Sequence, residues 1–135
     1  MALLTWDKKH SVGVEAMDGE HLELYDAINE LYVAVLERKE HSLIGPLLHK
    51  MVDCTRAHFS SEEAMLEAAR YPELAAHRIK HQSLLAEVEK LVYRFENGDL
   101  TLNPQSLNFL RYWFNAHIQN DDLPYGPWIK AHRSH

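Results

Sequence analysis

The stretch LAAHRIKHQSLLAEVEKLVYRF, residues 74–95, carries an apolar stripe at helical spacing together with two histidines. Apolar side chains that recur at steps of three and four residues predict an amphipathic helix with one buried face. His77 and His81 are four residues apart, so they share one face of that helix, and they continue the apolar stripe. We therefore expect both imidazoles to point inward. The apolar members of the stripe are Leu74, Leu84, Val88, Leu91 and Phe95.

Three other segments have the same helical periodicity, and no segment shows a convincing two-residue alternation of the kind that indicates a strand. Asp18 is the expected N-cap of the first helix, and Asn103-Pro104 is a typical start for the last one. Pro124, Gly126 and Pro127 are expected to end helical structure after residue 121. The predicted helices cover residues 18–38, 42–68, 72–97 and 104–121.

The short connections between these segments predict sequential helices that run antiparallel. The expected fold class is all-α: an up-down-up-down antiparallel four-helix bundle with an N-terminal extended arm. We expect one domain over residues 1–135, with the arm at 1–17, the bundle at 18–122 and a C-terminal tail at 123–135.

Composition narrows the class of protein. The 135 residues are 46% apolar with a net charge of −6, which favours a folded domain and argues against nucleic-acid binding. No signal peptide and no apolar run of membrane-spanning length is visible, so we expect a cytoplasmic protein without a membrane span. The lone cysteine, Cys54, has no partner for an intramolecular disulfide and is expected to be a small buried hydrophobe.

The histidines are expected to meet at one end of the bundle. His21 and His77 lie near the starts of the first and third predicted helices, whereas His58 and His117 lie near the ends of the second and fourth. In an antiparallel bundle these starts and ends share one pole. Glu62 lies four residues after His58 on the same helical face.

Such a cluster indicates a metal centre. A single inward histidine is more often a hydrogen-bonded core residue, but each unpaired buried polar group costs about 1–3 kcal/mol, and a metal offsets that cost. Five imidazoles with two carboxylates are too many ligands for one tetrahedral zinc, and they suit two first-row metals such as iron. The chain has no Glu-x-x-His motif, which argues against the ferritin-like di-iron enzymes. Spacing alone leaves Asp121 and Asp122 both open as the second carboxylate.

The order of these residues resembles the hemerythrin family, in particular its bacterial single-domain members. The resemblance covers nearly the whole chain. Myohemerythrin, a member of that family, is itself a known four-helix bundle. The residues that carry the resemblance are His21, the string His58-Phe59-Ser60-Ser61-Glu62-Glu63, His77 and His81, and His117 followed by Asp122 and Tyr125.

The resemblance implies two iron ions joined by an oxo or hydroxo bridge. One iron would be held by three histidines and the other by two, with two carboxylates bridging them; the family spacing His-x4-Asp selects Asp122. The implied metal residues are His21, His58, Glu62, His77, His81, His117 and Asp122.

The resemblance also implies a function: reversible binding of dioxygen at the open position of the two-histidine iron. We expect an oxygen carrier, store or delivery protein, not an enzyme, that also takes small anions such as azide. A monomer is expected. The alternatives are an oxygen or redox sensor, and a di-iron peroxidase or nitric-oxide-handling protein.

Several other residues have weaker assignments. Glu63 is expected to be a solvated acid beside the centre, and Glu20 is expected to face solvent. Phe114 stands where relatives are expected to have leucine, and its ring is expected to narrow the dioxygen pocket or its access route. Core residues expected to wall the pocket are Leu24, Tyr25, Ile28, Phe59 and Trp113. Surface histidines are expected at His10, His41, His49, His132 and His135.

Overall fold

The structure, a computed structural model, consists of helices and short connecting segments in the residues it describes, which are 4, 6, 8–98 and 102–132. The predicted all-α class is confirmed, and no strand occurs within those ranges. The elements are α1 (Glu15–Leu36), α2 (His41–Ala68), α3 (Leu74–Glu96), α4 (Pro104–His117) and α5 (Tyr125–Ala131), with a 3-10 turn at Lys8–His10 and a π-helical turn at Ile118–Asp122.

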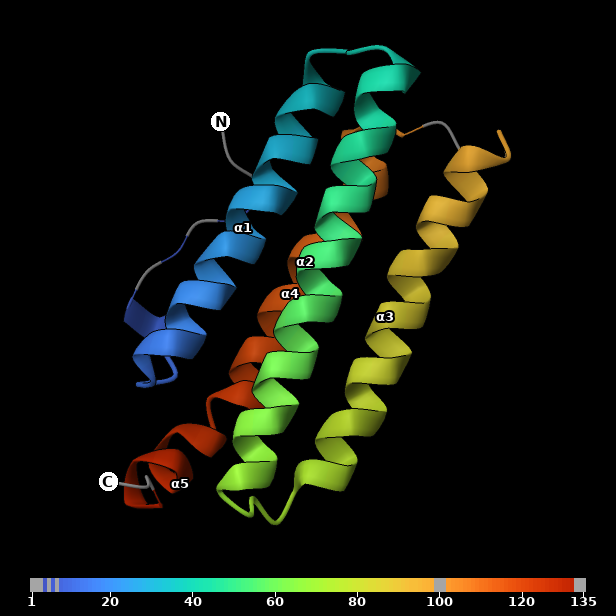
Figure 1. The fold of residues 1–135 in the computed structure, drawn as a ribbon. Coiled ribbons are helices and arrows are strands. Elements are labelled where there is room, and N and C mark those ends of the chain that lie inside the picture. Colours follow the sequence, from blue (N-terminus) through green and yellow to red (C-terminus); the bar gives the residue numbers. More distant parts are fainter. Residues whose placement is uncertain (1–3, 5, 7, 99–101, 133–135) are drawn as a thin grey trace.

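The four long helices lie side by side, as expected for a four-helix bundle (Figure 1). α1 packs against α2 and α4, and α2 also packs against α3. The starts of α1 and α3 and the ends of α2 and α4 lie at the end of the molecule that carries α5 (Figure 1). Every helix in the described part of the chain is too short or too polar to cross a lipid bilayer.

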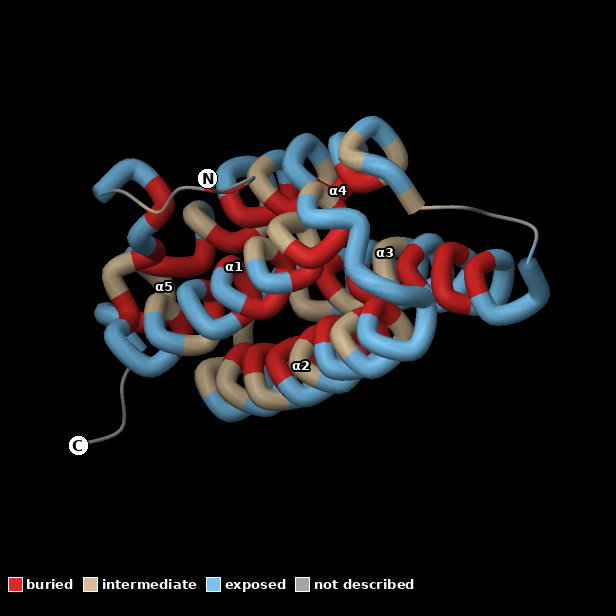
Figure 2. Tube along the Cα trace, turned by 90° about the horizontal axis from the view of Figure 1, so that it is seen from above, coloured by how far each residue is buried: buried red, intermediate tan, exposed pale blue. Residues whose placement is uncertain are grey.

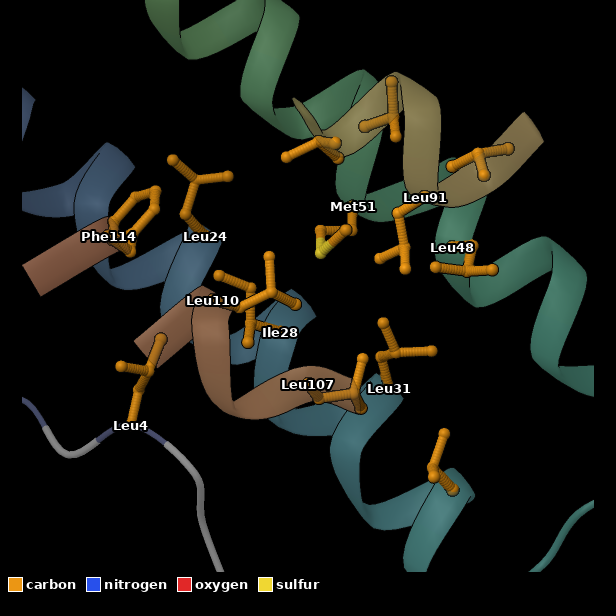
Figure 3. Packing of buried hydrophobic residues seen from close by; sticks show 14 of the residues in the cluster. Leu4, Leu24, Ile28, Leu31, Leu48, Met51, Leu91, Leu107, Leu110 and Phe114 are labelled. Atoms are coloured by element: carbon orange, nitrogen blue, oxygen red, sulfur yellow. The ribbon is translucent and has the colours of Figure 1, made fainter. Parts of the chain in front are cut away.

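Each long helix buries one stripe and exposes the opposite one (Figure 2). The main core lies between the helices and is built almost wholly of aliphatic side chains (Figure 3). Burial of such side chains contributes about 1.5–3 kcal/mol each, so this core is the main source of stability. Its fully buried members include Leu31, Leu48, Val88, Leu107 and Leu110.

A second, smaller apolar cluster closes the end of the bundle that carries α5. Leu66 of α2 and Tyr125 of α5 belong to it, together with residues that precede and begin α1. Along α2, the main core ends before His58 and the second cluster begins after Glu62. The polar layer therefore lies between two apolar layers, which keep water away from it. The buried members of the second cluster are Val12, Val14, Met17, Leu66, Tyr125 and Ile129.

The first helix begins at Glu15, three residues before the predicted start at Asp18. Asp18 is not the N-cap: its carboxylate accepts hydrogen bonds from the Ser11 hydroxyl and the Val12 backbone N–H. Those bonds tie the preceding segment to the first turn of α1. The predicted boundary at residues 17/18 thus lies inside a helix, and the described part of the predicted arm contains a 3-10 turn at Lys8–His10. Residues 1–3, 5 and 7 of that predicted arm lie outside the described residues.

The fourth helix begins as predicted. The Asn103 side chain accepts a hydrogen bond from the Ser106 backbone N–H, and Pro104 occupies the first helical position. The predicted end of the fourth helix near residue 121 is confirmed, because the π-helical turn that continues α4 ends at Asp122. The prediction of no helix beyond it is wrong, because α5 forms within the predicted tail at 123–135. Pro127 lies in the first turn of α5, where backbone N–H groups have no intrahelical partner, so a proline there removes no hydrogen bond.

Candidate metal centre

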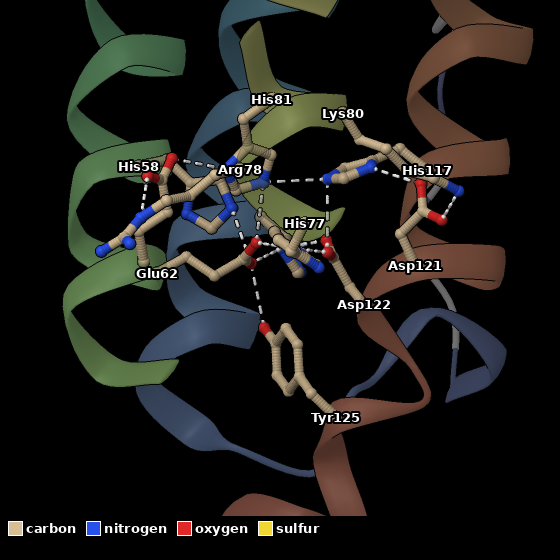
Figure 4. A network of polar contacts seen from close by, with 12 residues as sticks. His58, Glu62, His77, Arg78, Lys80, His81, His117, Asp121, Asp122 and Tyr125 are labelled. Atoms are coloured by element: carbon tan, nitrogen blue, oxygen red, sulfur yellow. Dashed lines mark hydrogen bonds and ion pairs between the residues drawn. The ribbon is translucent and has the colours of Figure 1, made fainter. Parts of the chain in front are cut away.

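The structure brings all seven predicted metal residues together, and all seven are buried. All of them except His21 are labelled in Figure 4. They form two overlapping groups, and within each group the atoms that offer a ligand lie within 4.8 Å of one another. One group contains three histidines and the other contains two, and both contain the same two carboxylates. The first group is Glu62, His77, His81, His117 and Asp122; the second is His21, His58, Glu62 and Asp122.

Every long helix contributes to this layer. His21 comes from α1, His58 and Glu62 from α2, His77 and His81 from α3, and His117 from the last position of α4. The two pairs spaced four residues apart each present both side chains on one face of a helix, as the spacing predicts.

Glu62 lies between the two groups of histidines. Its Oε1 atom is 2.7 Å from His77 Nε2 and 3.1 Å from His81 Nε2. Its Oε2 atom is 3.3 Å from His21 Nε2 and 3.2 Å from His58 Nε2. Each carboxylate oxygen thus faces a different group, which is the arrangement that a bridging ligand needs.

Asp122 divides its oxygens in the same way. Its Oδ2 atom is 3.2 Å from His21 Nε2, and its Oδ1 atom is 2.9 Å from His77 Nε2 and 3.2 Å from His117 Nε2. The Nε2 atoms of His81 and His117 are themselves 3.2 Å apart. Five imidazole nitrogens and four carboxylate oxygens therefore converge on one small volume.

The π-helical turn at Ile118–Asp122 explains how Asp122 reaches this volume. In a regular α-helix the residue four positions after His117, which is Asp121, would lie above it on the same face. The wider π turn brings the fifth residue, Asp122, onto the inner face instead. Asp121 then contacts the outer nitrogen of the same ring, with its Oδ2 atom 2.8 Å from His117 Nδ1.

Two further histidines have a carboxylate on the outer ring nitrogen. Glu20 Oε1 is 2.7 Å from His58 Nδ1, and Glu63 Oε2 is 2.8 Å from His81 Nδ1. A carboxylate on Nδ1 favours the tautomer that carries its proton there, so we assign the inward Nε2 atoms as lone-pair donors.

These contacts correct two predictions. Glu20 does not simply face solvent: its side chain is 28% exposed and binds His58. Glu63, predicted to be a solvated acid, is half-buried against His81. Helical spacing relates residues within one helix, and both contacts join different helices, so no local signal in the sequence marks them.

Tyr125 of α5 also contacts the centre. Its hydroxyl donates a hydrogen bond to Glu62 Oε2 at 3.0 Å (Figure 4). Burial, together with the nearby carboxylates, raises the pKa of the Tyr125 phenol, so the group stays a donor. Tyr125 belongs to the second apolar cluster, so this bond links that cluster to the centre and helps to fix the orientation of the Glu62 carboxylate.

The protein groups alone shift the pKa values in this layer strongly. Burial lowers the pKa of His58, but the hydrogen bond to Glu20 and the nearby carboxylate of Glu62 outweigh it and raise that pKa to about 9. Burial likewise opposes protonation of His77, and contacts with Asp122 and Glu62 raise its pKa to about 9. Burial raises the pKa of Glu62, yet hydrogen bonds from four histidines hold it well below the usual range.

The donor set fits a pair of metal ions. His21 Nδ1, His58 Nε2 and both Asp122 oxygens are buried without a hydrogen bond in the part of the chain described. Buried carboxylates and imidazoles without full hydrogen bonding are costly, and cations shared by the two groups would satisfy them. The ligand atoms are nitrogen and oxygen only, which suits first-row metals such as iron.

The predictions for the remaining histidines are confirmed in part. His41, His49 and His132 are exposed as predicted, and His135 lies outside the described residues. The prediction for His10 is wrong: it is buried and its ring contacts those of Trp6 and Tyr25. Trp6 also lies near His21, with ring centroids 6.4 Å apart, so it covers one side of the centre.

The residues predicted to wall the pocket are buried except Trp113, which is half-buried. Cys54, predicted to be buried, is half-buried against the core.

An all-helical bundle with two histidine groups joined by shared carboxylates defines a protein with a candidate two-metal centre, and comparisons place it in a family. The model of the hemerythrin HHE cation-binding domain matches residues 12–129. The chain is 32% identical to a bacteriohemerythrin of Stenotrophomonas maltophilia over 98% of its length and 85% of that protein. It is also 32% identical to a bacteriohemerythrin of Methylococcus capsulatus, over 97% of this chain and 100% of that one.

A solved structure supports the same assignment. A wild-type hemerythrin superposes with a TM-score of 0.89 at 30% identity, covering 95% of this chain and 98% of that one. The chain therefore belongs to the hemerythrin family, and the resemblance inferred from its histidine pattern is confirmed.

Proposed function

We propose that this protein binds dioxygen reversibly at a non-haem di-iron centre and serves as an oxygen carrier, store or delivery protein. The observation that carries the proposal is the division of five buried histidines into a group of three and a group of two around two shared carboxylates. Membership of a cation-binding family supports it.

Each residue of the layer has a role in the proposal. His77, His81 and His117 would hold one iron, and His21 and His58 the other. Glu62 and Asp122 would bridge the two, with an oxo or hydroxo group between them. When bound, the two irons supply the two electrons that reversible dioxygen binding requires.

The unequal division of histidines is what favours a small ligand. An iron held by His21 and His58 would have one protein ligand fewer than the other, which would leave room for dioxygen or for an anion such as azide. The Phe114 ring lies near His21, at a centroid distance of 6.5 Å, and it is 1% exposed. Apolar cover of this kind excludes water and favours an apolar diatomic molecule.

We further propose that the protein binds dioxygen without consuming it. The carboxylates beside the centre hold the Nδ1 atoms of His58, His81 and His117, and the Tyr125 hydroxyl is held by Glu62. An enzyme would need an acid or base free to exchange protons with a substrate. The predicted monomeric state, cytoplasmic location and azide binding stay predictions.

The test is the optical spectrum of the anaerobically reduced, iron-loaded protein before air, after air and after oxygen removal. A charge-transfer band that appears with air and disappears on deoxygenation is the expected result. Direct conversion to a diferric form that deoxygenation does not reverse would overturn the carrier assignment and favour a redox sensor. Continuous consumption of oxygen or peroxide would favour the enzyme alternative.

A further inference from the structure

The three carboxylates on the outer histidine nitrogens differ in what holds their other oxygen. Asp121 pairs with the ammonium of Lys80, and Glu63 Oε1 is 3.3 Å from Nε of Arg78 (Figure 4). Glu20 Oε2 accepts instead from the neutral hydroxyl of Ser61 at 2.8 Å.

This difference separates the two groups of the centre. The two carboxylates whose second oxygen pairs with a cation bind His81 and His117, which belong to the three-histidine group. The carboxylate whose second oxygen accepts a hydrogen bond from a hydroxyl binds His58, which belongs to the two-histidine group. The arrangement is therefore asymmetric in charge as well as in the number of histidines.

The direction of the effect follows from simple electrostatics. A carboxylate on Nδ1 increases the negative charge and basicity of the ring, which makes its Nε2 atom a stronger donor to a metal. A cation on the far oxygen of that carboxylate draws charge away from the ring and weakens the donation. Stronger donation favours the ferric over the ferrous state, so the cation favours the ferrous state.

We propose that Lys80 and Arg78 are positioning residues that, through Asp121 and Glu63, raise the reduction potential of the metal held by the three-histidine group. The proposal rests on the di-iron centre of the proposed function. The histidine, the carboxylate and the cation form a chain of polar contacts, which we call the relay. Removal of the cation therefore changes the reduction potential of the metal only while the carboxylate is present.

The relay is accessible to mutation without disturbance of the core. The Lys80 side chain is 55% exposed and that of Arg78 is 43% exposed. Exposed charges at a distance are strongly screened by solvent and salt. A sizeable effect of either cation thus has to pass through the hydrogen-bonded carboxylate.

The experiment is a double-mutant cycle of Lys80→Gln and Asp121→Asn, read as the midpoint potential of the iron-loaded protein in an anaerobic spectroelectrochemical titration. Lys80→Gln is expected to lower the potential by about 59 mV, which is a tenfold change in the ferric-to-ferrous ratio for one electron. Asp121→Asn is expected to raise it. In the Asp121→Asn background, Lys80→Gln is expected to have no effect, and Arg78→Gln is expected to act through Glu63 in the same way.

The matched control is Lys50→Gln. Lys50 is 54% exposed and pairs with Glu30 at 2.8 Å, and Glu30 contacts none of the seven candidate ligands in the described structure. Its substitution is expected to leave the potential unchanged. A Lys80→Gln variant that behaves like this control overturns the proposal, and so does an equal shift with and without the Asp121 carboxylate.

A second readout separates this inference from the proposed function. Cobalt(II) affinity, measured without iron or dioxygen, is expected to fall about 10–100-fold in Asp121→Asn and to rise in Lys80→Gln, again only when Asp121 is present. A centre that shows these couplings but does not bind dioxygen reversibly would refute the carrier function alone. Reversible dioxygen binding without the couplings would refute the relay alone.

Discussion

Gly126 lies so close to Val12 that a Cβ atom on residue 126 would stand 2.2 Å from the Val12 carbonyl oxygen. This contact seats the start of α5 on the segment that precedes α1. The preceding residue, Tyr125, is thereby held where its hydroxyl reaches Glu62. A backbone contact outside the metal layer thus supports one of its shared carboxylates.

Gly126→Ala is therefore expected to destabilise the protein. The added methyl group meets backbone, which yields less readily than a side chain, and overpacking of this kind costs about 1–3 kcal/mol. The measurement is the free energy of unfolding in urea. The control is Gly19→Ala in α1, where a Cβ atom meets nothing within 4 Å and alanine is expected to stabilise the helix by about 0.5–1 kcal/mol. Equal effects of the two substitutions would show that the Val12 contact does not constrain α5.

Asp121 and Asp122 are expected to respond differently to the same change. Asp122→Asn removes a carboxylate whose two oxygens face both histidine groups, so the number of irons bound per chain is expected to fall below two. Asp121→Asn removes the partner of His117 Nδ1 and of the Lys80 ammonium but none of the seven candidate ligands, and two irons are expected to bind when iron is saturating. Colorimetric iron determination on desalted protein measures both. Loss of iron in the Asp121 variant alone would reverse the two assignments.

This pair shows how far the sequence alone can go. The periodicity of residues 74–95 and the positions of the histidines predict the helices and their convergence, because both follow from the 3.6-residue turn. Spacing alone does not select Asp122 over Asp121, which has the usual same-face spacing of four residues from His117, because only a π turn moves the inner face by one position. Only the family spacing His-x4-Asp selects Asp122.

Contacts between helices were the least predictable feature. Glu20 lies next to His21 in sequence but binds His58, 38 residues away. The side chain of His10 is buried by Trp6 and Tyr25, and nothing in its local sequence marks it as interior. The short α5 helix is not predicted by the sequence pattern, because proline and glycine are typical helix breakers, although a first turn tolerates both.

The metal-free protein is expected to lose stability as the pH rises from about 6.5 to about 9. The pKa of His58 is raised from 6.5 to about 9 in the folded protein, so its protonated form stabilises the fold fully below the unfolded value. That contribution disappears as the pH passes the folded value. The raised pKa of His77 acts in the same direction. For His58 the shift corresponds to a contribution on the order of 3 kcal/mol.

Urea unfolding of the metal-free protein at several pH values tests this expectation. The decline is expected to be smaller in His58→Gln, which lacks one of the buried histidines whose pKa is raised. His49→Gln is the control, because His49 pairs with Glu96 on the surface and is 56% exposed. Metal is expected to suppress the decline, since it takes the place of the protons. A flat stability profile over this pH range in the metal-free protein would contradict the prediction.

Phe114 is expected to control the entry of small ligands to the two-histidine side of the centre. Its ring packs edge-on against both His21 and Tyr25, at centroid distances of 6.5 and 5.6 Å. Phe114→Ala opens this packing, and stopped-flow mixing is expected to show faster azide binding to the diferric protein and altered oxygen kinetics. Truncation of a buried phenylalanine also costs about 3–5 kcal/mol, so Phe114→Leu provides a milder variant that is expected to change the rates in the same direction.

Phe95→Leu separates access from stability. Phe95 is also a buried aromatic residue of the main core, but it stacks on His41, far along α3 from His77 and His81. Its substitution is expected to destabilise the fold and to leave the azide rate unchanged. If both Phe114 variants bind azide and oxygen at the wild-type rates, the ring is a packing residue of the core and the route to the centre lies elsewhere.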